Sequence, residues 1–261
     1  MSKGNTLVRD YVEPATWASD WQVLKSMIFA DVKGETQQER LESFYVSQAD
    51  LYDSYRCRML HGRLPMAKSM PAPKNGVWVD LGGGTGSNLE FYGKDGLRHW
   101  KKCYVLDLCK ALADTAQKRV DKNGWNDFVD IIVGDACNHE CKGLPKAGTV
   151  DLVTFSYALS MIPDWREAIR NAWRLLKPGG HIAVCDFTVS EDQWPGMSAL
   201  WTWIFSNDHV HLKSEHIPTL STAFEKVECE VGFGDFPYVP SCAVCPYYYF
   251  IGKKNSKECP I

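Results

Sequence analysis

The sequence predicts an α/β fold built on a mostly parallel sheet. Two observations lead to this prediction. From residue 76 onward, short apolar runs alternate with amphipathic stretches, and the first run, at residues 77–81, leads directly into a glycine-rich turn. Apolar strands separated by helical stretches are typical of β-α-β units, in which each helix returns the chain to the same end of a parallel sheet. The 261 residues, 45% of them hydrophobic, suffice for one such domain with a helical extension.

The segment before the sheet is expected to be helical. Trp17, Trp21, Leu24 and Ile28 recur at the spacing of one helix face, and a second apolar stretch follows at about residues 41–51. We therefore expect an N-terminal helical cap or lid over residues 1–70. Residues 71–261 then form the α/β domain as a single compact unit.

The sheet itself is predicted from seven runs. Five of them should form parallel strands, at residues 77–81, 103–108, 129–136, 150–159 and 181–187. A helix is predicted through Ala168 to Trp173, ended by the Lys-Pro-Gly-Gly sequence at 177–180, and another helix after Phe187. Two late runs, at 226–231 and 247–252, predict a hairpin at the edge of the sheet, which brings the total to seven strands.

Charge and composition argue against several function classes. The 29 Lys and Arg residues against 32 Asp and Glu give a net charge of −3, which lacks the broad positive field of nucleic-acid-binding proteins. We find no apolar run long enough to cross a bilayer, and the polar first residues do not resemble a signal peptide. A cytoplasmic protein with free thiols is therefore expected, although the chain has ten cysteines.

The glycine-rich turn, residues 82–88, is the first sign of a ligand. A turn of this kind between a strand and a helix, here expected to begin near Leu89, lets a ligand lie against bare backbone. The dinucleotide fingerprint G-x-G-x-x-G does not fit, because counting from Gly82 or Gly84 its last position falls on Ser87 or Leu89. The spacing instead resembles the first motif of class I S-adenosylmethionine-dependent methyltransferases, and the residues that carry it are Asp80, Gly82, Gly83, Gly84 and Gly86.

Residues at the ends of the next strands complete a predicted cofactor pocket. Asp107 ends the second strand, where a carboxylate can accept hydrogen bonds from both ribose hydroxyls, and Leu108 can cover one face of the adenine. Asp135, beside Ala136, can accept from the adenine amino group, and Ser156 lies at the exit of the fourth strand. Near the turn, an acidic group can receive the ammonium of the cofactor. Each feature alone has a structural explanation, but their joint order predicts a site for S-adenosylmethionine.

Nearly the whole chain, from about residue 17 to 253, resembles a narrower family, the betaine-lipid methyltransferases. The strings that carry this resemblance lie at residues 39–45, 48–53, 60–63, 78–88, 154–163 and 208–212. The resemblance implies a Rossmann-like class I methyltransferase fold with a seven-stranded, mostly parallel sheet and an N-terminal helical cap. It also implies an enzyme that methylates the amino group of diacylglyceryl-homoserine three times, yielding diacylglyceryl-N,N,N-trimethylhomoserine. A separate aminocarboxypropyl transferase would supply this glycerolipid, and the enzyme would associate peripherally with a membrane.

Methyl transfer to an amine requires a neutral nitrogen held against the methyl carbon, so either desolvation or a proton acceptor must favour the neutral form. Tyr52, Tyr157, His209 and His211 are the candidates for this catalytic role. No metal is expected, because displacement at a methyl group needs none. The short Cys137-x-His139-x-Cys141 cluster and the pair Cys242 and Cys245 lack a second matched pair of ligands.

Other groups have candidate roles in binding the lipid. A quaternary ammonium product is best accommodated by aromatic faces, and Trp201, Trp203 and residues 247–249 offer them unless they belong to the core. The homoserine carboxylate needs a cation. The candidates are Arg56, Arg58, Arg63 and Lys213. The Trp17 face can lie on a membrane or pack against the sheet.

Two other readings of the sequence stay open. The same fold can methylate phosphoethanolamine, another small amine or a quinone ring, and a phosphate-bearing acceptor should prefer a cluster of cations beside the pocket. A non-catalytic scaffold is the second reading, but it has no physical need for all of the predicted cofactor residues.

Overall fold

The computed structural model describes residues 59–190, 212–235, 244–256 and 258–261, together with the single positions 36, 38, 39, 42, 196, 197, 199 and 201. Most of the predicted helical cap, over residues 1–70, lies outside the described residues. Of this cap the structure describes residues 59–70, which contain helix α4, Arg63–Ser69, and four of the single positions.

The described chain forms one seven-stranded sheet, which confirms the predicted fold class. The strand order is β3-β2-β1-β4-β5-β7-β6, and neighbouring strands from β3 to β5 are parallel, whereas β7 runs antiparallel to both β5 and β6. The strands are β1 (Val77–Leu81), β2 (Lys102–Asp107), β3 (Val129–Val133), β4 (Val150–Ser156), β5 (Leu176–Phe187), β6 (Glu225–Gly234) and β7 (Cys245–Lys253). The predicted late hairpin is thus the antiparallel edge of the sheet.

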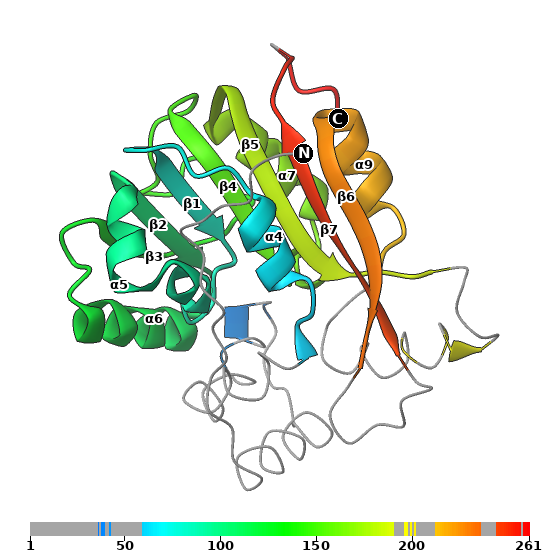
Figure 1. Ribbon diagram of the computed structural model, residues 1–261, viewed down its shortest axis with the longest axis horizontal. Helices are drawn as coiled ribbons and strands as arrows, with labels where there is room; N and C mark the ends of the chain where they lie inside the picture. The colour runs from blue at the N-terminus through cyan, green and yellow to red at the C-terminus, as the bar shows by residue number, and fades with distance from the viewer. Residues whose placement is uncertain are drawn as a thin grey trace, which may run out of the picture.

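Helices cover both faces of the sheet (Figure 1). One face carries α4, the 3₁₀ helices η1 and η2, and α6, over a core that includes Trp78, Tyr92 and Val120. The other face carries η3, α7 and α9 over a second core that includes Ile169 and Phe250. The remaining bounds are η1 (Ser87–Tyr92), α5 (Gly93–Gly96), η2 (Leu97–His99), α6 (Lys110–Asn123), η3 (Leu159–Met161), α7 (Trp165–Leu175) and α9 (His216–Ala223).

Two boundaries differ from the prediction. The helix after the glycine turn begins at Ser87 and is a 3₁₀ helix instead of an α-helix. The Lys-Pro-Gly-Gly sequence was expected to separate a helix from a strand, but α7 ends at Leu175 and Leu176 already pairs with Val150. The backbone explains this: Gly179 N–H donates to the carbonyl of Lys254 at 2.8 Å, so the glycines continue the sheet as an irregular stretch of β5.

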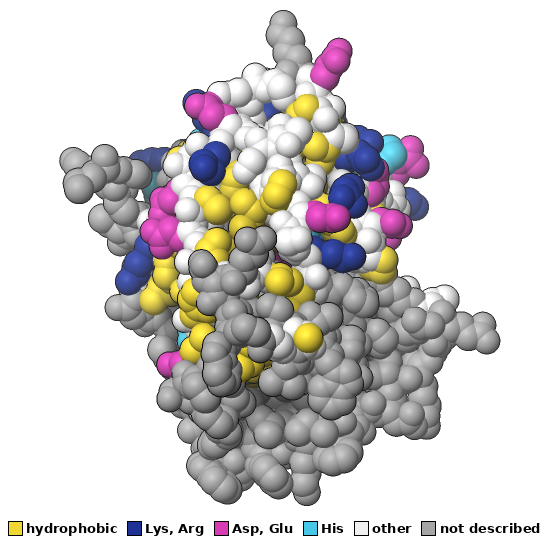
Figure 2. Space-filling view, turned by 90° about the vertical axis from the view of Figure 1, so that its right-hand side faces the viewer, with side chains coloured by type: hydrophobic (Ala, Val, Ile, Leu, Met, Phe, Trp, Pro, Cys, Tyr) yellow, Lys and Arg dark blue, Asp and Glu magenta, His cyan; other side chains and the backbone are white. Residues whose placement is uncertain are grey.

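The surface on the β6 side carries hydrophobic side chains among charged ones (Figure 2). On β6 itself Val227, Val231 and Phe233 are exposed. None of the helices described is both long and apolar enough to span a bilayer. The cysteines that the structure describes are free thiols, as expected.

Candidate active site

An open pocket lies at the carboxyl ends of strands β1, β2, β3 and β4, where a parallel sheet places its ligand-binding loops. Its empty volume, including the open mouth, is about 900 Å³. Most of the predicted cofactor residues line it, namely Gly82, Gly83, Gly84, Asp107, Leu108, Asp135, Ala136 and Ser156. The structure therefore brings together residues that are up to 74 positions apart in the sequence.

The glycine turn needs glycine for steric reasons. Gly82 has φ +68°, and a Cβ there would lie 2.6 Å from the Cβ of Ala158. A Cβ on Gly83 would lie 2.6 Å from Val105 Cγ1. The backbone N–H groups of Gly82 and Gly83 donate to the carbonyl of Leu106 at 2.8 and 3.0 Å, which fixes the turn against β2. The turn can therefore present backbone directly to a ligand.

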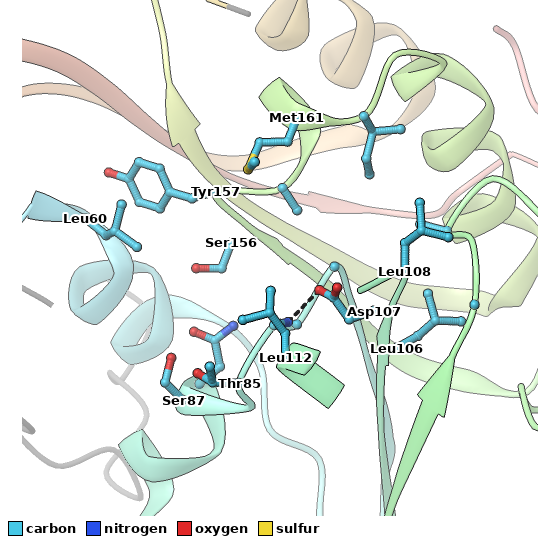
Figure 3. Close-up of a pocket in the computed structure, with 18 of the residues that line it drawn as sticks. Leu60, Thr85, Ser87, Leu106, Asp107, Leu108, Leu112, Ser156, Tyr157 and Met161 are labelled. Carbon is cyan, nitrogen blue, oxygen red and sulfur yellow. Dashed lines mark hydrogen bonds between the residues drawn. The ribbon is translucent and has the colours of Figure 1, made fainter. Parts of the chain in front are cut away.

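Asp107 is the buried carboxylate of the pocket. Its Oδ2 accepts the N–H of Gly84 at 2.8 Å (Figure 3). Its Oδ1 accepts the N–H of Cys109 at 2.9 Å. Burial raises the pKa of Asp107 from its ordinary 3.8 to about 6, against the lowering effect of these two hydrogen bonds. Each oxygen keeps a free lone pair, so the carboxylate can still accept two hydroxyl hydrogen bonds from a ligand.

Asp80 and Gly86 do not line the pocket, although both were predicted to hold the cofactor. Asp80 is 1% exposed, and it accepts the Thr154 hydroxyl at 2.5 Å and Asn88 Nδ2 at 2.9 Å. Burial raises the pKa of Asp80 in spite of these donors. A Cβ on Gly86 would be 3.4 Å from Ala116 of α6. Asp80 therefore supports the wall from behind. The 3.4 Å at Gly86 is an ordinary van der Waals distance, so it is the φ of +71° that favours glycine there and not the packing of α6.

Asn88 links this buried carboxylate to a cation on the pocket wall. Its Oδ1 accepts Arg63 Nη2 at 2.7 Å and Arg63 Nε at 3.3 Å, while Arg63 Nη2 also donates to Ser87 Oγ at 2.7 Å. Arg63, Ser87 and Asn88 all line the pocket. The start of α4 is thereby joined to the last two residues of the glycine-rich turn.

Comparison with known proteins identifies the family. A family profile described as a methyltransferase domain matches residues 52–231, well over half of the chain. The chain belongs to this methyltransferase family. It is 31% identical over 156 residues to the ubiquinone/menaquinone biosynthesis C-methyltransferase UbiE of Roseobacter denitrificans, over 57% of this chain and 59% of that relative. The match thus spans about three fifths of the relative's length.

Solved structures share the fold at low sequence identity. A methyltransferase described as putative from Bacillus halodurans superposes with a TM-score of 0.60 at 16% identity, covering 75% of this chain and 99% of that one. Phosphoethanolamine N-methyltransferase 2 of Haemonchus contortus, solved with S-adenosyl-L-methionine, gives a TM-score of 0.64 at 16% identity, covering 85% and 61%. The methyltransferase therefore has the Rossmann-like class I fold that its sequence predicted.

The methyltransferase uses S-adenosylmethionine, and the pocket fits this cofactor. The glycine cradle leaves no room for a Cβ on Gly82, and Asp107 offers two acceptors for a diol. Ser156 Oγ is buried without a hydrogen-bond partner among the described residues, although it lines the pocket. A buried hydroxyl without a partner is costly in the free protein and can be satisfied by a ligand. Leu108 and Leu112 supply apolar wall beside Asp107 (Figure 3).

Tyr157 is the one catalytic candidate that lies among the described residues of the methyltransferase. It lines the pocket at the exit of β4 and has φ +55°, a conformation that is unusual for a residue other than glycine. Its hydroxyl donates to the carbonyl of His61 at 2.5 Å, and burial raises its pKa well above the usual value of 10. The side chain is therefore a phenol at neutral pH. Tyr52, His209 and His211 lie outside the described residues.

The aromatic candidates for cation binding divide between core and surface. Trp201 is buried and its Nε1 donates to the carbonyl of Val244 at 3.0 Å, and Tyr248 and Tyr249 are buried as well. These side chains belong to the core, whereas Tyr247 is half-buried and Trp203 lies outside the described residues. Within the described part, no group of three His, Cys, Asp or Glu side chains could hold a metal ion.

Several pocket residues of the methyltransferase were not predicted as cofactor ligands. Thr85, Ser87 and Asn88 belong to the glycine-rich turn, and this position alone would have been a usable signal. Leu112 and Met161 gave none, because their place on the wall depends on how the α6 and η3 segments fold back over the sheet. The complete described lining also includes Leu60, Arg63, Leu106, Gly134, Ala158 and Ile162.

Proposed function

We propose that this methyltransferase methylates the amino group of diacylglyceryl-homoserine and so produces diacylglyceryl-N,N,N-trimethylhomoserine. One observation carries the proposal: two of the strings that resemble the betaine-lipid methyltransferases supply pocket-lining residues outside the glycine turn. Leu60 and Arg63 come from the string at residues 60–63, and Tyr157 and Met161 come from the string at 154–163. The resemblance therefore extends to residues that line the pocket.

The chemistry of this wall suits an amine acceptor. Leu60, Tyr157 and Met161 contribute apolar atoms to the pocket wall, and a poorly solvated amine has a lower pKa than one in water. When bound, S-adenosylmethionine supplies the methyl group as an activated sulfonium substituent. The protein's own residues hold the nitrogen in line and exclude water, and the face of the Tyr157 ring can accommodate the quaternary ammonium that repeated methylation yields. Tyr157 remains the described candidate for contact with the acceptor nitrogen.

The acyl chains of such an acceptor stay in a membrane while the head group reaches the pocket, so we also propose peripheral association with a membrane surface. The exposed side chains of Val227, Val231 and Phe233 on β6 support this proposal. β6 ends at Gly234, which packs against the ring of His61, and the preceding residue, Leu60, lines the pocket. The Trp17 face lies outside the described residues. A separate aminocarboxypropyl transferase would make the acceptor.

Two other acceptors have specific support. The similarity to UbiE, named as a C-methyltransferase of ubiquinone and menaquinone biosynthesis, favours a quinone precursor. The fold likeness to phosphoethanolamine N-methyltransferase 2 favours a phosphate-bearing amine. A phosphate dianion calls for several cations. Among the described lining residues of the pocket, Arg63 is the only Lys or Arg. One cation matches the singly charged carboxylate of homoserine better than a phosphate dianion.

The test is a rate comparison on purified full-length protein with S-adenosylmethionine. Diacylglyceryl-homoserine, a demethylated quinone precursor and phosphoethanolamine are offered separately, each in the same mixed micelles, and methylated products are quantified by mass spectrometry. We expect turnover of the homoserine lipid at a kcat/KM at least tenfold above the other two. Faster turnover of the quinone or of phosphoethanolamine would reject the proposed acceptor while leaving the methyltransferase family assignment intact. The Asp107→Ala variant serves as the background.

A further inference from the structure

Arg63 is a buried cation without an ion-pair partner among the described residues. Its side chain is 9% exposed, and its described partners are the neutral groups of Ser87 and Asn88 and, at 5.3 Å, the ring of Phe91. The hydrogen bonds occupy Nε and Nη2. Nη1 has no partner among the residues that the structure describes, although the residue lines the pocket.

The carboxyl group of Asp80 is separated from the Arg63 guanidinium by the side chain of Asn88. Asp80 reaches Arg63 only through Asn88, whose Nδ2 donates to Asp80 and whose Oδ1 accepts from Arg63. A buried charge is costly unless it is paired, and guanidinium groups prefer the planar, two-oxygen geometry of carboxylates. The free protein therefore holds a positive charge at the wall that an anionic ligand would neutralise.

The backbone before Arg63 is fixed in place, so the side chain has little freedom to turn away. Gly62 has φ +82° and packs so closely that a Cβ would be 2.7 Å from the Tyr247 ring. His61 stacks on the same ring at 5.9 Å, and its Nε2 lies 2.8 Å from the carbonyl oxygen of Asp235. A rigid scaffold of this kind preorganises a binding group.

Arg63 also lies at a defined end of the pocket. Figure 3 shows Asp107 and Leu108 at one side of the pocket, with Ser87, Leu60 and Tyr157 at the other. Since Arg63 donates to Ser87, its guanidinium lies at the end away from Asp107. If Asp107 binds the ribose, the opposite end is the place for the amino-acid part of the cofactor and for the head group of the acceptor.

We infer that Arg63 binds a ligand carboxylate at this end of the pocket. Two molecules could provide the group, because the cofactor carries an α-carboxylate and so does the homoserine head group of the proposed acceptor. The first source depends only on S-adenosylmethionine as cofactor. The second rests on the proposed function, and two arms of one experiment distinguish them.

The cofactor arm compares two ligands that differ in the carboxylate. S-adenosylhomocysteine has the complete amino-acid end, whereas methylthioadenosine keeps the nucleoside and sulfur and lacks the carboxylate. Their dissociation constants are measured calorimetrically on the wild type, Arg63→Gln and Arg63→Lys. Arg98→Gln is the matched control, because Arg98 lies over the Phe128 ring at the same 5.3 Å, is exposed and does not line the pocket.

If the cofactor provides the carboxylate, Arg63→Gln weakens S-adenosylhomocysteine about 10- to 100-fold and leaves methylthioadenosine within about twofold. Arg63→Lys keeps the charge but loses the two-pronged geometry, so its loss is intermediate. Arg98→Gln changes neither ligand. Because the two ligands are compared on the same folded variant, a general loss of stability cannot imitate this difference.

The acceptor arm measures binding of diacylglyceryl-homoserine micelles, and of the corresponding carboxamide lipid, to protein saturated with S-adenosylhomocysteine. If the acceptor provides the carboxylate, wild type prefers the acid and Arg63→Gln binds both lipids alike, with S-adenosylhomocysteine affinity unchanged. If wild type binds neither lipid, the proposed function fails and the cofactor arm alone decides. The inference is overturned when Arg63→Gln shows no carboxylate-dependent loss in either arm, or weakens ligands with and without the carboxylate equally.

Discussion

The Tyr157 hydroxyl donates a hydrogen bond of 2.5 Å to the backbone carbonyl of His61, 96 positions earlier in the sequence. Cys185 Sγ donates to the same carbonyl at 3.2 Å. These contacts join the exits of β4 and β5 to the segment before α4, which carries Leu60 and Arg63 into the pocket wall. The ends of β4 and β5 and the segment before α4 are therefore connected through one carbonyl oxygen.

The Tyr157→Phe variant tests what this hydroxyl does. Its proton is engaged by His61 and its raised pKa keeps it a phenol, so we expect kcat to fall by less than about tenfold. Loss of the hydrogen bond should lower the free energy of unfolding by about 1 kcal/mol. Steady-state kinetics and denaturant titration measure the two effects. A drop in kcat beyond about a hundredfold with unchanged stability would show instead that the hydroxyl takes part in proton transfer.

Cofactor affinity should depend on pH through Asp107. Hydroxyl donors prefer the ionised carboxylate, and with a pKa of about 6 the free protein takes up a proton there as the pH falls. Binding of S-adenosylhomocysteine should therefore weaken about tenfold between about pH 7 and about pH 5. In Asp107→Asn, binding should be weaker throughout and flat over that range, as calorimetry at several pH values can show. If Asp107→Asn kept the full pH dependence of binding, that dependence would belong to another titratable group.

The stability of the free protein should follow the opposite trend. Burial raises the pKa of Asp107, and of Asp186, from 3.8 to about 6, so the unfolded chain releases these protons before the folded one. Stability contributed by these groups is present below about pH 4 and declines as the pH rises to about 6. Asp107→Asn should remove part of this decline and leave the Asp186 part. Unfolding free energies that rise over this interval in both proteins would contradict the assignment.

The glycine cradle is tested by Gly82→Ala with Gly124→Ala as its control. The two glycines have nearly equal φ angles, +68° and +67°, but only at Gly82 would a Cβ meet another atom, Ala158 Cβ at 2.6 Å. The shared left-handed strain costs about 1–2 kcal/mol in each variant. We expect Gly82→Ala to lower the free energy of unfolding by roughly a further 1–3 kcal/mol. We also expect this variant to bind no measurable cofactor. Equal losses of stability with normal binding in both variants would show that the turn does not approach the ligand closely.

Local patterns in the sequence were sufficient to predict the sheet. Strand runs such as residues 77–81 and 247–252 are apolar because they are buried on both faces, and this signal survives without tertiary information. The predicted start of β5 was wrong, because Pro178 and two glycines usually end a helix or strand. Here the backbone of Lys254 pairs with Gly179 and Gly180 and continues the sheet.

The candidate site was predictable where ligand contacts follow strand ends. Asp107 and Ser156 occupy such positions, and both line the pocket. Asp80 also lies near the end of a strand, but Thr154 and Asn88 enclose its carboxylate. No local sequence pattern predicts the contact with Thr154, which lies 74 residues away. The role of Arg63 likewise depends on how α4 meets the glycine turn, so the sequence offered it only as one of four possible cations.

The identity of the acceptor atom tests the central claim most directly. Protein, deuterated-methyl S-adenosylmethionine and diacylglyceryl-homoserine in mixed micelles are sampled over time, and tandem mass spectrometry locates the label in each product. We predict successive lipids with one, two and three labelled methyl groups, all on the head-group nitrogen, and no product with Asp107→Ala. An unlabelled lipid pool, under conditions in which calorimetry shows cofactor bound, would contradict the account.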